Sequence, residues 1–405
     1  MATSSKLVLM AFTVWLACAQ LTAQAVTPLQ PKADDEVLEV LPLITRNRVA
    51  RPAATATPPA ADPAPAAAQA RKDIGLARET GDTRYWGRAQ AVLAPWWDVP
   101  SAPADVAVLQ ATVQQGRHEF DASRKLLART LARTPGHAQG WLNLAALERL
   151  GGRYAESLKA CESVARAGAD LYAQACRLET QSLQGQQPLA ATGFKNLLAQ
   201  TSDKNQRSWL LSLVAENAER NGQDAVAAQA YTQSLALEPE LYTTIAYSDL
   251  LLRLGKPGKA LQVLAASPET DAVLLRRAAA WRKLGDARWT ATREQLKERA
   301  GELVRRGDDP TLHGRELALI ALWLDDDARG ALAFAQQNLL LQREPIDWWV
   351  AASSARIANN EAALKQLTQA ADATGLRDGR LTEALKGSKL AMPLAKTQAQ
   401  KQGAK

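Results

Sequence analysis

The sequence predicts an all-α fold, a solenoid of stacked two-helix hairpins, on three observations. Its 405 residues are 47% apolar but only 5% aromatic, and they are rich in Ala, Leu, Arg and Gln, which favour helices over sheet. Few runs alternate between apolar and polar residues, as half-buried strands do. A spacing of about 34 residues recurs along the chain, and a repeat of this length indicates stacked units rather than two or three separate domains.

The N-terminal segment 1–25 has the features of an export signal. Lys6 precedes the apolar run 7–19, which is too short to span a bilayer, and Ala23-Gln24-Ala25 offers a small-residue cleavage site. We therefore expect cleavage after Ala25 and export to the periplasm.

Cys18 leaves an alternative open. Leu16-Ala17-Cys18 partly resembles a bacterial lipobox, whose cysteine is lipidated and becomes the mature N-terminus. Trp15 stands where a medium aliphatic residue is expected, which favours ordinary cleavage. A membrane-anchored lipoprotein is the alternative, and we expect membrane contact only if Cys18 is lipidated.

Composition divides the rest of the chain. The segment "ADDEVLEVLPLI" (33–44) is short and amphipathic, and residues 51–69 form a Pro/Ala linker that is too poor in large apolar side chains to be buried. Helical periodicity begins near Lys72 and continues to about Lys386. The predicted parts are a signal peptide (1–25), the amphipathic segment and linker (26–71), an N-terminal helical cap (72–103), helical repeats (104–375), and a helix end with a basic disordered tail (376–405).

The formal charge of +7 does not indicate nucleic acid. Five lysines lie in the C-terminal tail, where no acidic residue follows Glu383, and Lys6 leaves with the signal peptide; without these six lysines the charge is +1. A basic tail is usually a solvated chain end, so we expect no nucleic-acid partner. The tail lysines are Lys386, Lys389, Lys396, Lys401 and Lys405.

Two prolines set the repeat period. Counting back about 34 residues, the length of one such repeat, from the hairpin ends near Pro135 and Pro239 gives units at 104–137 and 208–241. A unit that begins at Ala138 fits the same spacing. Small residues at corresponding places in these units allow close helix approach, so the pattern describes packing rather than chemistry.

These units resemble the tetratricopeptide repeat (TPR) family, whose pattern runs Trp, Leu-Gly and Tyr on the first helix, Ala, Phe and Ala on the second, and Pro at the end. The stretches "WLNLAALERLGGRYAES", "LVAENAERNGQDAVAAQAYTQSLALEPE" and "LLLRLGKPGKALQVL" carry the pattern best, and the resemblance covers roughly residues 104–375. It implies a superhelix with a concave face that binds another protein or a peptide. The units near 171–201, 271–303, 314–345 and 346–375 are degenerate.

The sequence offers little for catalysis. It contains no phosphate-binding loop, zinc-protease motif, nucleophile elbow or CxxC pair. His118, His137 and His313 are scattered, so a metal cluster or a histidine-activated nucleophile lacks residues. The run Asp325-Asp326-Asp327 lacks the alternation and the glycine of a calcium loop. We expect no enzyme activity, no bound metal and no cofactor.

Cys161 and Cys176 form a candidate disulfide. They lie at equal distances on either side of the turn "ARAGAD", so they sit at the same level of an antiparallel hairpin. Export to an oxidising compartment favours a bridge between them. The alternative is two small buried residues in a helix seam, and the sequence leaves both open.

Basic residues recur just before the turn glycines, at Arg149, Arg220 and Arg253, and again at Arg282. The plainer interpretation is that cations stabilise a helix C-terminus whatever the function. In some TPR proteins, basic residues near this place line the concave face and hold the terminal carboxylate of a partner. The asparagines that accompany such a clamp are not evident in this sequence.

The resemblance also places aromatic and acidic residues on the expected concave face. Such a mixture suits a peptide ligand, although packing between helices is the plainer interpretation of the two aromatic side chains. The expected function is a non-catalytic, protein- or peptide-binding scaffold or adaptor in the bacterial cell envelope. The alternatives are an accessory factor in envelope polysaccharide synthesis or export, and a lipid-anchored assembly scaffold. The candidate binding residues are Arg149, Trp209, Glu216, Arg220, Tyr242, Asp249 and Arg253.

Overall fold

The computed structural model describes residues 62–305 and 309–386, together with Ala33. The predicted signal peptide, Cys18, nearly all of the segment 33–44, the first part of the linker and the tail beyond Lys386 lie outside these residues. From residue 62 onward the described residues belong to one compact unit. None of the helices in this unit has the length and apolar character that a membrane crossing requires.

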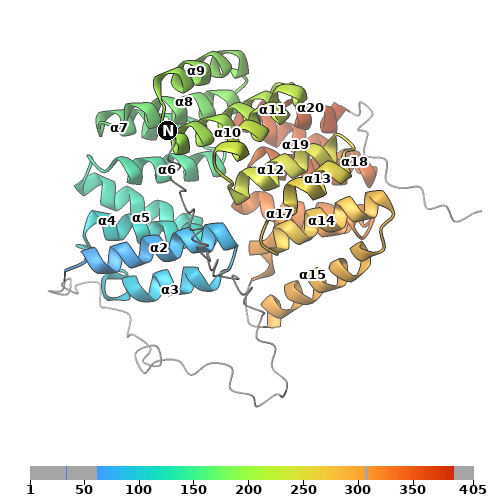
Figure 1. Ribbon diagram of the computed structural model, residues 1–405, viewed down its shortest axis with the longest axis horizontal. Helices are drawn as coiled ribbons and strands as arrows, with labels where there is room; N and C mark the ends of the chain where they lie inside the picture. The colour runs from blue at the N-terminus through green and yellow to red at the C-terminus, as the bar shows by residue number, and fades with distance from the viewer. Residues whose placement is uncertain (1–32, 34–61, 306–308, 387–405) are drawn as a thin grey trace, which may run out of the picture. The chain divides into compact units, whose positions relative to one another are not determined.

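The described residues form consecutive helices that pair as hairpins, each packing on the next (Figure 1). This confirms the predicted all-α solenoid. The elements are α2 (Ala64–Thr80), α3 (Arg84–Leu93), η1 (Ala94–Trp96), α4 (Ala104–Gly116), α5 (Phe120–Arg133), α6 (Ala138–Leu150), α7 (Tyr154–Arg166), α8 (Asp170–Leu183), α9 (Gln187–Gln200), α10 (Lys204–Arg220), α11 (Asp224–Leu237), α12 (Leu241–Arg253), α13 (Pro257–Leu264), α14 (Asp271–Leu284), α15 (Arg288–Arg305), η2 (Pro310–His313), α16 (Gly314–Trp323), α17 (Ala328–Leu341), α18 (Pro345–Ile357), α19 (Glu361–Thr374) and α20 (Gly379–Lys386).

The repeat pattern coincides with hairpin geometry. Within the hairpin α6–α7, Gly152 adopts φ 72° at the turn between the two helices, a backbone conformation that favours glycine. Ala145 is fully buried and Tyr154 is 3% exposed, because both face the neighbouring helices. The repeated small and aromatic positions therefore serve turning and packing, as the sequence predicts.

The first helix begins earlier than predicted. Helix α2 starts at Ala64, whereas the sequence analysis places residues 64–69 in the linker and the start of helical structure near Lys72. Pro65 lies in the first turn, where a missing N–H costs nothing, and alanine has the highest helix propensity. Because Ala67 is buried and Ala66 packs against an apolar cluster, this part of the linker does contribute to a core.

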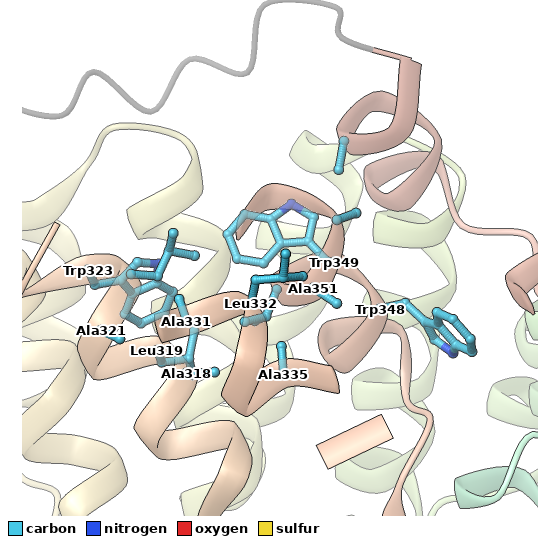
Figure 2. Close-up of a cluster of buried hydrophobic side chains, with 14 of the residues drawn as sticks. Ala318, Leu319, Ala321, Trp323, Ala331, Leu332, Ala335, Trp348, Trp349 and Ala351 are labelled. Atoms are coloured by element: carbon cyan, nitrogen blue, oxygen red, sulfur yellow. The ribbon is translucent and has the colours of Figure 1, made fainter. Parts of the chain in front are cut away.

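The largest apolar core lies in the C-terminal hairpins. Figure 2 shows its centre, where α16, α17 and α18 bring together Trp323, Leu332 and Trp349, while Trp348 points to a different side of α18. Trp348 and Trp349 are 3% and 7% exposed, so both rings of this pair belong to the core. At the N-terminal pair, Trp96 is buried and Trp97 is partly buried.

The last hairpins return to earlier ones. The backbone N–H of Arg343 donates to the Leu150 carbonyl (2.7 Å), and that of Arg377 donates to the Leu183 carbonyl (2.8 Å). Helix α20 packs against α10, and α2 contacts α12. Hairpins far apart in the chain thus touch, and the solenoid completes a turn that closes on itself.

Cys161 on α7 and Cys176 on α8 are joined by a disulfide, with their Cα atoms 5.7 Å apart. The bond crosses the turn between two successive hairpins, and both cysteines are 2% exposed. Of the two possibilities that the sequence leaves open, the structure has the bridge.

Candidate functional site

A cavity of about 460 Å³ lies on the inner side of the solenoid, which closes on itself at α20. Its wall comes mainly from the first helices of six successive hairpins, α6, α8, α10, α12, α14 and α16. The turn before α18 and the first residues of α18 and α20 complete it. The concave face is therefore partly filled by the protein's own C-terminal residues, instead of forming the open groove that the resemblance implies.

Five of the seven candidate binding residues meet in this cavity. The sequence reasoning placed them on one face through the repeat period, and the structure brings them together from α6, α10 and α12. They are Arg149, Glu216, Arg220, Tyr242 and Asp249.

The two other candidates do not line the cavity. Trp209 is partly buried and packs with Tyr172 of α8, their ring centroids 5.4 Å apart, so it fills the seam between hairpins. Arg253 forms ion pairs with Glu219 (3.1 Å) and Asp224 (2.6 Å). Because its guanidinium is used in joining α12 to the preceding hairpin, its role as a binding residue is not supported.

The arginines before the turn glycines form contacts between hairpins. Arg149 pairs with Glu179 of the following hairpin (2.8 Å), and Arg282 pairs with Asp326 (2.5 Å) across to the loop before α17. Each lies in the last turn of its helix, as the dipole argument requires. Their side chains nevertheless form ion pairs with carboxylates of other hairpins. Neither interpretation from the sequence, stabilisation of the helix C-terminus or binding of a partner, included this role.

Tyr242 forms the exposed edge of the cavity, beside the largely buried side chain of Glu216. Tyr242 is 57% exposed, and its hydroxyl donates to Glu216 Oε1 (2.8 Å). Burial raises the pKa of Glu216, and the nearby carboxylate of Glu179 raises it further, whereas Arg220 acts in the opposite direction. The negative charge of Glu216 raises the pKa of Tyr242 well above its ordinary value. At neutral pH the tyrosine therefore stays a neutral hydrogen-bond donor.

Arg220 is the most buried cation of the wall. Its side chain is 4% exposed; Nε donates to Ser182 Oγ (2.9 Å), and Nη1 lies 3.4 Å from Glu216 Oε2. Its Nη2 is buried without a hydrogen-bond partner among the described residues. Buried donors are normally paired, so an orphaned one calls for an explanation.

Several charged wall residues were missed by the sequence reasoning, including Arg276 on α14, Arg315 on α16 and Arg380 on α20. Arg276 forms a paired contact with both oxygens of Asp249 (2.9 and 2.8 Å). The repeat period could have placed Arg276 and Arg315 at equivalent positions of later hairpins. Nothing in the period could have placed Arg380, which reaches the cavity only because the solenoid closes.

The three consecutive aspartates have structural partners. Asp325 pairs with Arg293, Asp326 pairs with Arg282, and Asp327 caps α17 by accepting from Gly330 N (2.8 Å). Across the residues that the structure describes, no group of three His, Cys, Asp or Glu side chains has a metal-binding arrangement. The arginine, carboxylate and tyrosine side chains of the cavity can form hydrogen bonds and ion pairs.

Comparisons with known proteins match solved structures. A scan of protein-family models and a search of curated proteins both gave no match. A tetratricopeptide repeat protein from Parabacteroides merdae is 13% identical, with 58% of this chain and 93% of that chain covered and a TM-score of 0.39. The TPR domain of P58(IPK) is 17% identical, with 78% and 96% covered and a TM-score of 0.23. The spacing and packing of its own hairpins show that the chain is an all-α solenoid, with repeats that resemble the tetratricopeptide pattern.

Proposed function

We propose that this protein is a non-catalytic binding scaffold of the bacterial cell envelope that receives another protein or a peptide at the exposed edge of its inner cavity. Stacked helical repeats present extended concave surfaces of the kind that such partners use. The export signal expected at residues 1–25 supports the envelope as its location.

The single observation behind this proposal is the position of Tyr242. Its ring is 57% exposed and stands at the cavity beside charged residues of α10 and α12. A tyrosine held by a hydrogen bond to Glu216 presents a large contact area with little rotamer freedom to lose. Such residues are frequent among the energetically dominant contacts of interfaces.

Site-specific photocrosslinking in intact cells tests the proposal. A photoreactive amino acid at Tyr242 should capture a partner that mass spectrometry identifies, because the partner covers this ring. The matched control carries the same group at Leu189 on α9, a side chain that is similarly exposed, at 53%, but does not line the cavity. Equal crosslinking at both positions, or none at Tyr242, would remove the cavity edge as the binding surface.

A further inference from the structure

Two histidines meet where the solenoid closes. His118 lies in the turn between α4 and α5, and His313 is the last residue of η2, directly before α16. Their ring centroids are 6.2 Å apart, although they come from hairpins far apart in the chain. His118 also lines a surface pocket of about 360 Å³ with Leu150 and Arg343, which form one of the closing backbone hydrogen bonds. The contact between the two rings thus belongs to the closure of the solenoid.

His118 occupies a place that other hairpins give to glycine. Its φ is 61°, and the N–H of the next residue, Glu119, donates to the Gln114 carbonyl at the end of α4. Gly152 holds the corresponding place after α6 and Gly222 after α10, with φ values of 72° and 70°. Glycine adopts this left-handed conformation easily, whereas a side chain makes it less favourable. An unfavourable backbone conformation at a histidine points to a use for its side chain.

The surroundings of the His118 ring suit its neutral form. The ring contacts those of His313 and Phe120, the latter at a centroid distance of 5.4 Å. Its Nδ1 is buried and has no hydrogen-bond partner among the described residues. A neutral imidazole carries a proton on one ring nitrogen, whereas an imidazolium carries one on both. Protonation of His118 would therefore leave a charged N–H buried without an acceptor, which is costly.

The charges at the start of α16 act on His118 in both directions. Burial lowers the pKa of His118 and is the largest cause of the shift. His313 and Arg315 lower the pKa further, whereas the carboxylate of Glu316 raises it. The net effect is a lowered pKa, so the closed contact favours the neutral ring.

The other charged residues of the pocket do not reverse this preference. Of its two carboxylates, the Glu119 side chain is 41% exposed and pairs with Arg117 (2.9 Å), and the Asp121 side chain is 84% exposed. Water and salt screen such exposed charges, and the arginines of the pocket disfavour a second cation. These charged residues are Glu119, Asp121, Arg153 and Arg343.

Acid should therefore weaken the contact. When the contact opens, the His118 ring enters water, where a histidine has a pKa of about 6.5. The open form then binds a proton more tightly than the closed form, whose pKa is lowered. The contact has its full stability well above about pH 6.5 and loses it as the pH falls below this value toward the lowered pKa of the closed form.

We propose that His118 and His313 form an acid-sensitive latch, in which protonation of His118 separates the α4–α5 turn from η2 and the start of α16. Arg315 and Glu316, which lie just after His313, also line the inner cavity. Opening of the latch therefore changes one wall of the cavity and makes closure of the solenoid depend on pH. The latch does not require the partner proposed above.

Hydrogen exchange measured by mass spectrometry at pH 7.5 and 5.5, corrected for the intrinsic pH dependence of exchange, tests the opening. In the wild type, peptides that cover 114–122 and 309–316 should exchange roughly threefold faster or more at pH 5.5, because the latch is open more of the time. A peptide from α18, which lies in the large apolar core, should not change. No increase at the latch, or an equal increase in α18 that indicates general unfolding, overturns the proposal.

The same substitution at two histidines tests the location. His118→Asn removes the titrating ring but keeps a residue that tolerates a positive φ, so the difference between the two pH values should disappear. His137→Asn is the matched control, and it should keep the difference. His137 caps α6 by accepting from Gly140 N (3.0 Å), a role that asparagine also fills. A difference that persists in His118→Asn, or is lost in His137→Asn, would assign the pH effect to another group and overturn the latch.

Glu316→Gln tests the sign. Because Glu316 raises the pKa of His118, loss of its charge should make protonation of the closed form harder and the increase in exchange at pH 5.5 larger. An unchanged or smaller increase would contradict the proposed arrangement of charges around His118. The photocrosslinking at Tyr242 is carried out at neutral pH, so either proposal can fail without the other.

Discussion

The hairpins before and after α12 are held together in different ways. Between α4 and α11 the apolar core is divided into small clusters, and a disulfide joins α7 to α8. From α12 onward one large cluster spans the hairpins and includes three tryptophans. The earlier half has the clearer repeat pattern, and the later half has the larger core.

The difference teaches that a clear repeat motif does not locate the main source of stability. The large cluster also contains Tyr154 of α7 and Leu183 of α8, which belong to the earlier hairpins. They join it because the last hairpins fold back upon them. Closure of the solenoid turn thus joins the earlier half, which has small apolar clusters, to the later half, which has the large one.

The largest expected effect is in the core of the later half. Trp349→Ala removes a ring that is 7% exposed within the large cluster, and it should lower the free energy of unfolding by about 3 to 5 kcal/mol. Trp209→Ala is the matched control in the earlier half, where the ring is only partly buried and the loss should be smaller. Urea unfolding followed by circular dichroism measures both. An equal loss at the two positions would contradict the contrast between the halves.

The disulfide should be the main covalent support of the earlier half. For a sequence separation of 15, the chain-entropy model gives about 3 kcal/mol of stabilisation. Replacing both cysteines by alanine should therefore lower the free energy of unfolding by about that amount. Thermal unfolding with and without a reductant checks this in the wild type. If alkylation gives the same mass before and after reduction, the bridge is absent and the prediction fails.

A smaller effect tests the contact that closes the turn. A Cβ atom at Gly379 would lie 3.1 Å from the backbone carbonyl oxygen of Arg220, so Gly379→Ala should push α20 away from α10 and cost about 1 to 3 kcal/mol. Gly258→Ala is the matched control: Gly258 also lies in the first turn of a helix, but nothing lies within 4 Å of its Cβ position.

Hydrogen exchange of residues 376–386 is the measurement for this pair. Faster exchange there in Gly379→Ala, with no change in Gly258→Ala, would show that the close approach to Arg220 sustains closure. The same exchange rate in both variants would indicate that α20 tolerates the displacement.

The smallest expected effect concerns Glu216 and pH. Because its pKa is raised in the folded protein, the folded state holds this proton more tightly than the unfolded state. Lowering the pH from 7 through the folded pKa toward the unfolded value of about 4.3 should therefore stabilise the wild type relative to Glu216→Gln. Unfolding curves at several pH values test the sign. A wild type that loses stability relative to the variant in this window would show that Arg220 controls this carboxyl.

The sequence predicted what neighbouring hairpins share. Trp141, Gly152 and Tyr154 repeat at a fixed spacing because each hairpin packs on the next, so turns and buried faces follow from the period. The same reasoning located Arg149, Glu216 and Asp249 on one face, and they do line the cavity.

It could not predict contacts between distant hairpins. Arg343 and Arg380 reach the cavity through the closing of the turn, which depends on small rotations accumulated over many hairpins rather than on any local motif. For the same reason the sequence predicted an open concave face, whereas the structure has a partly filled one. Trp209 packs between hairpins, which is the alternative that the sequence analysis left open for this ring.

The closing hydrogen bonds also fix how many repeats the protein can have. An open solenoid can gain or lose a hairpin during evolution, because each unit contacts only its neighbours. Here Arg343 must meet Leu150 and Arg377 must meet Leu183. An inserted or deleted hairpin between them would shift one end of the turn by a whole unit and separate these pairs. The number of hairpins between α6 and α20 is thus set by the cavity that they enclose.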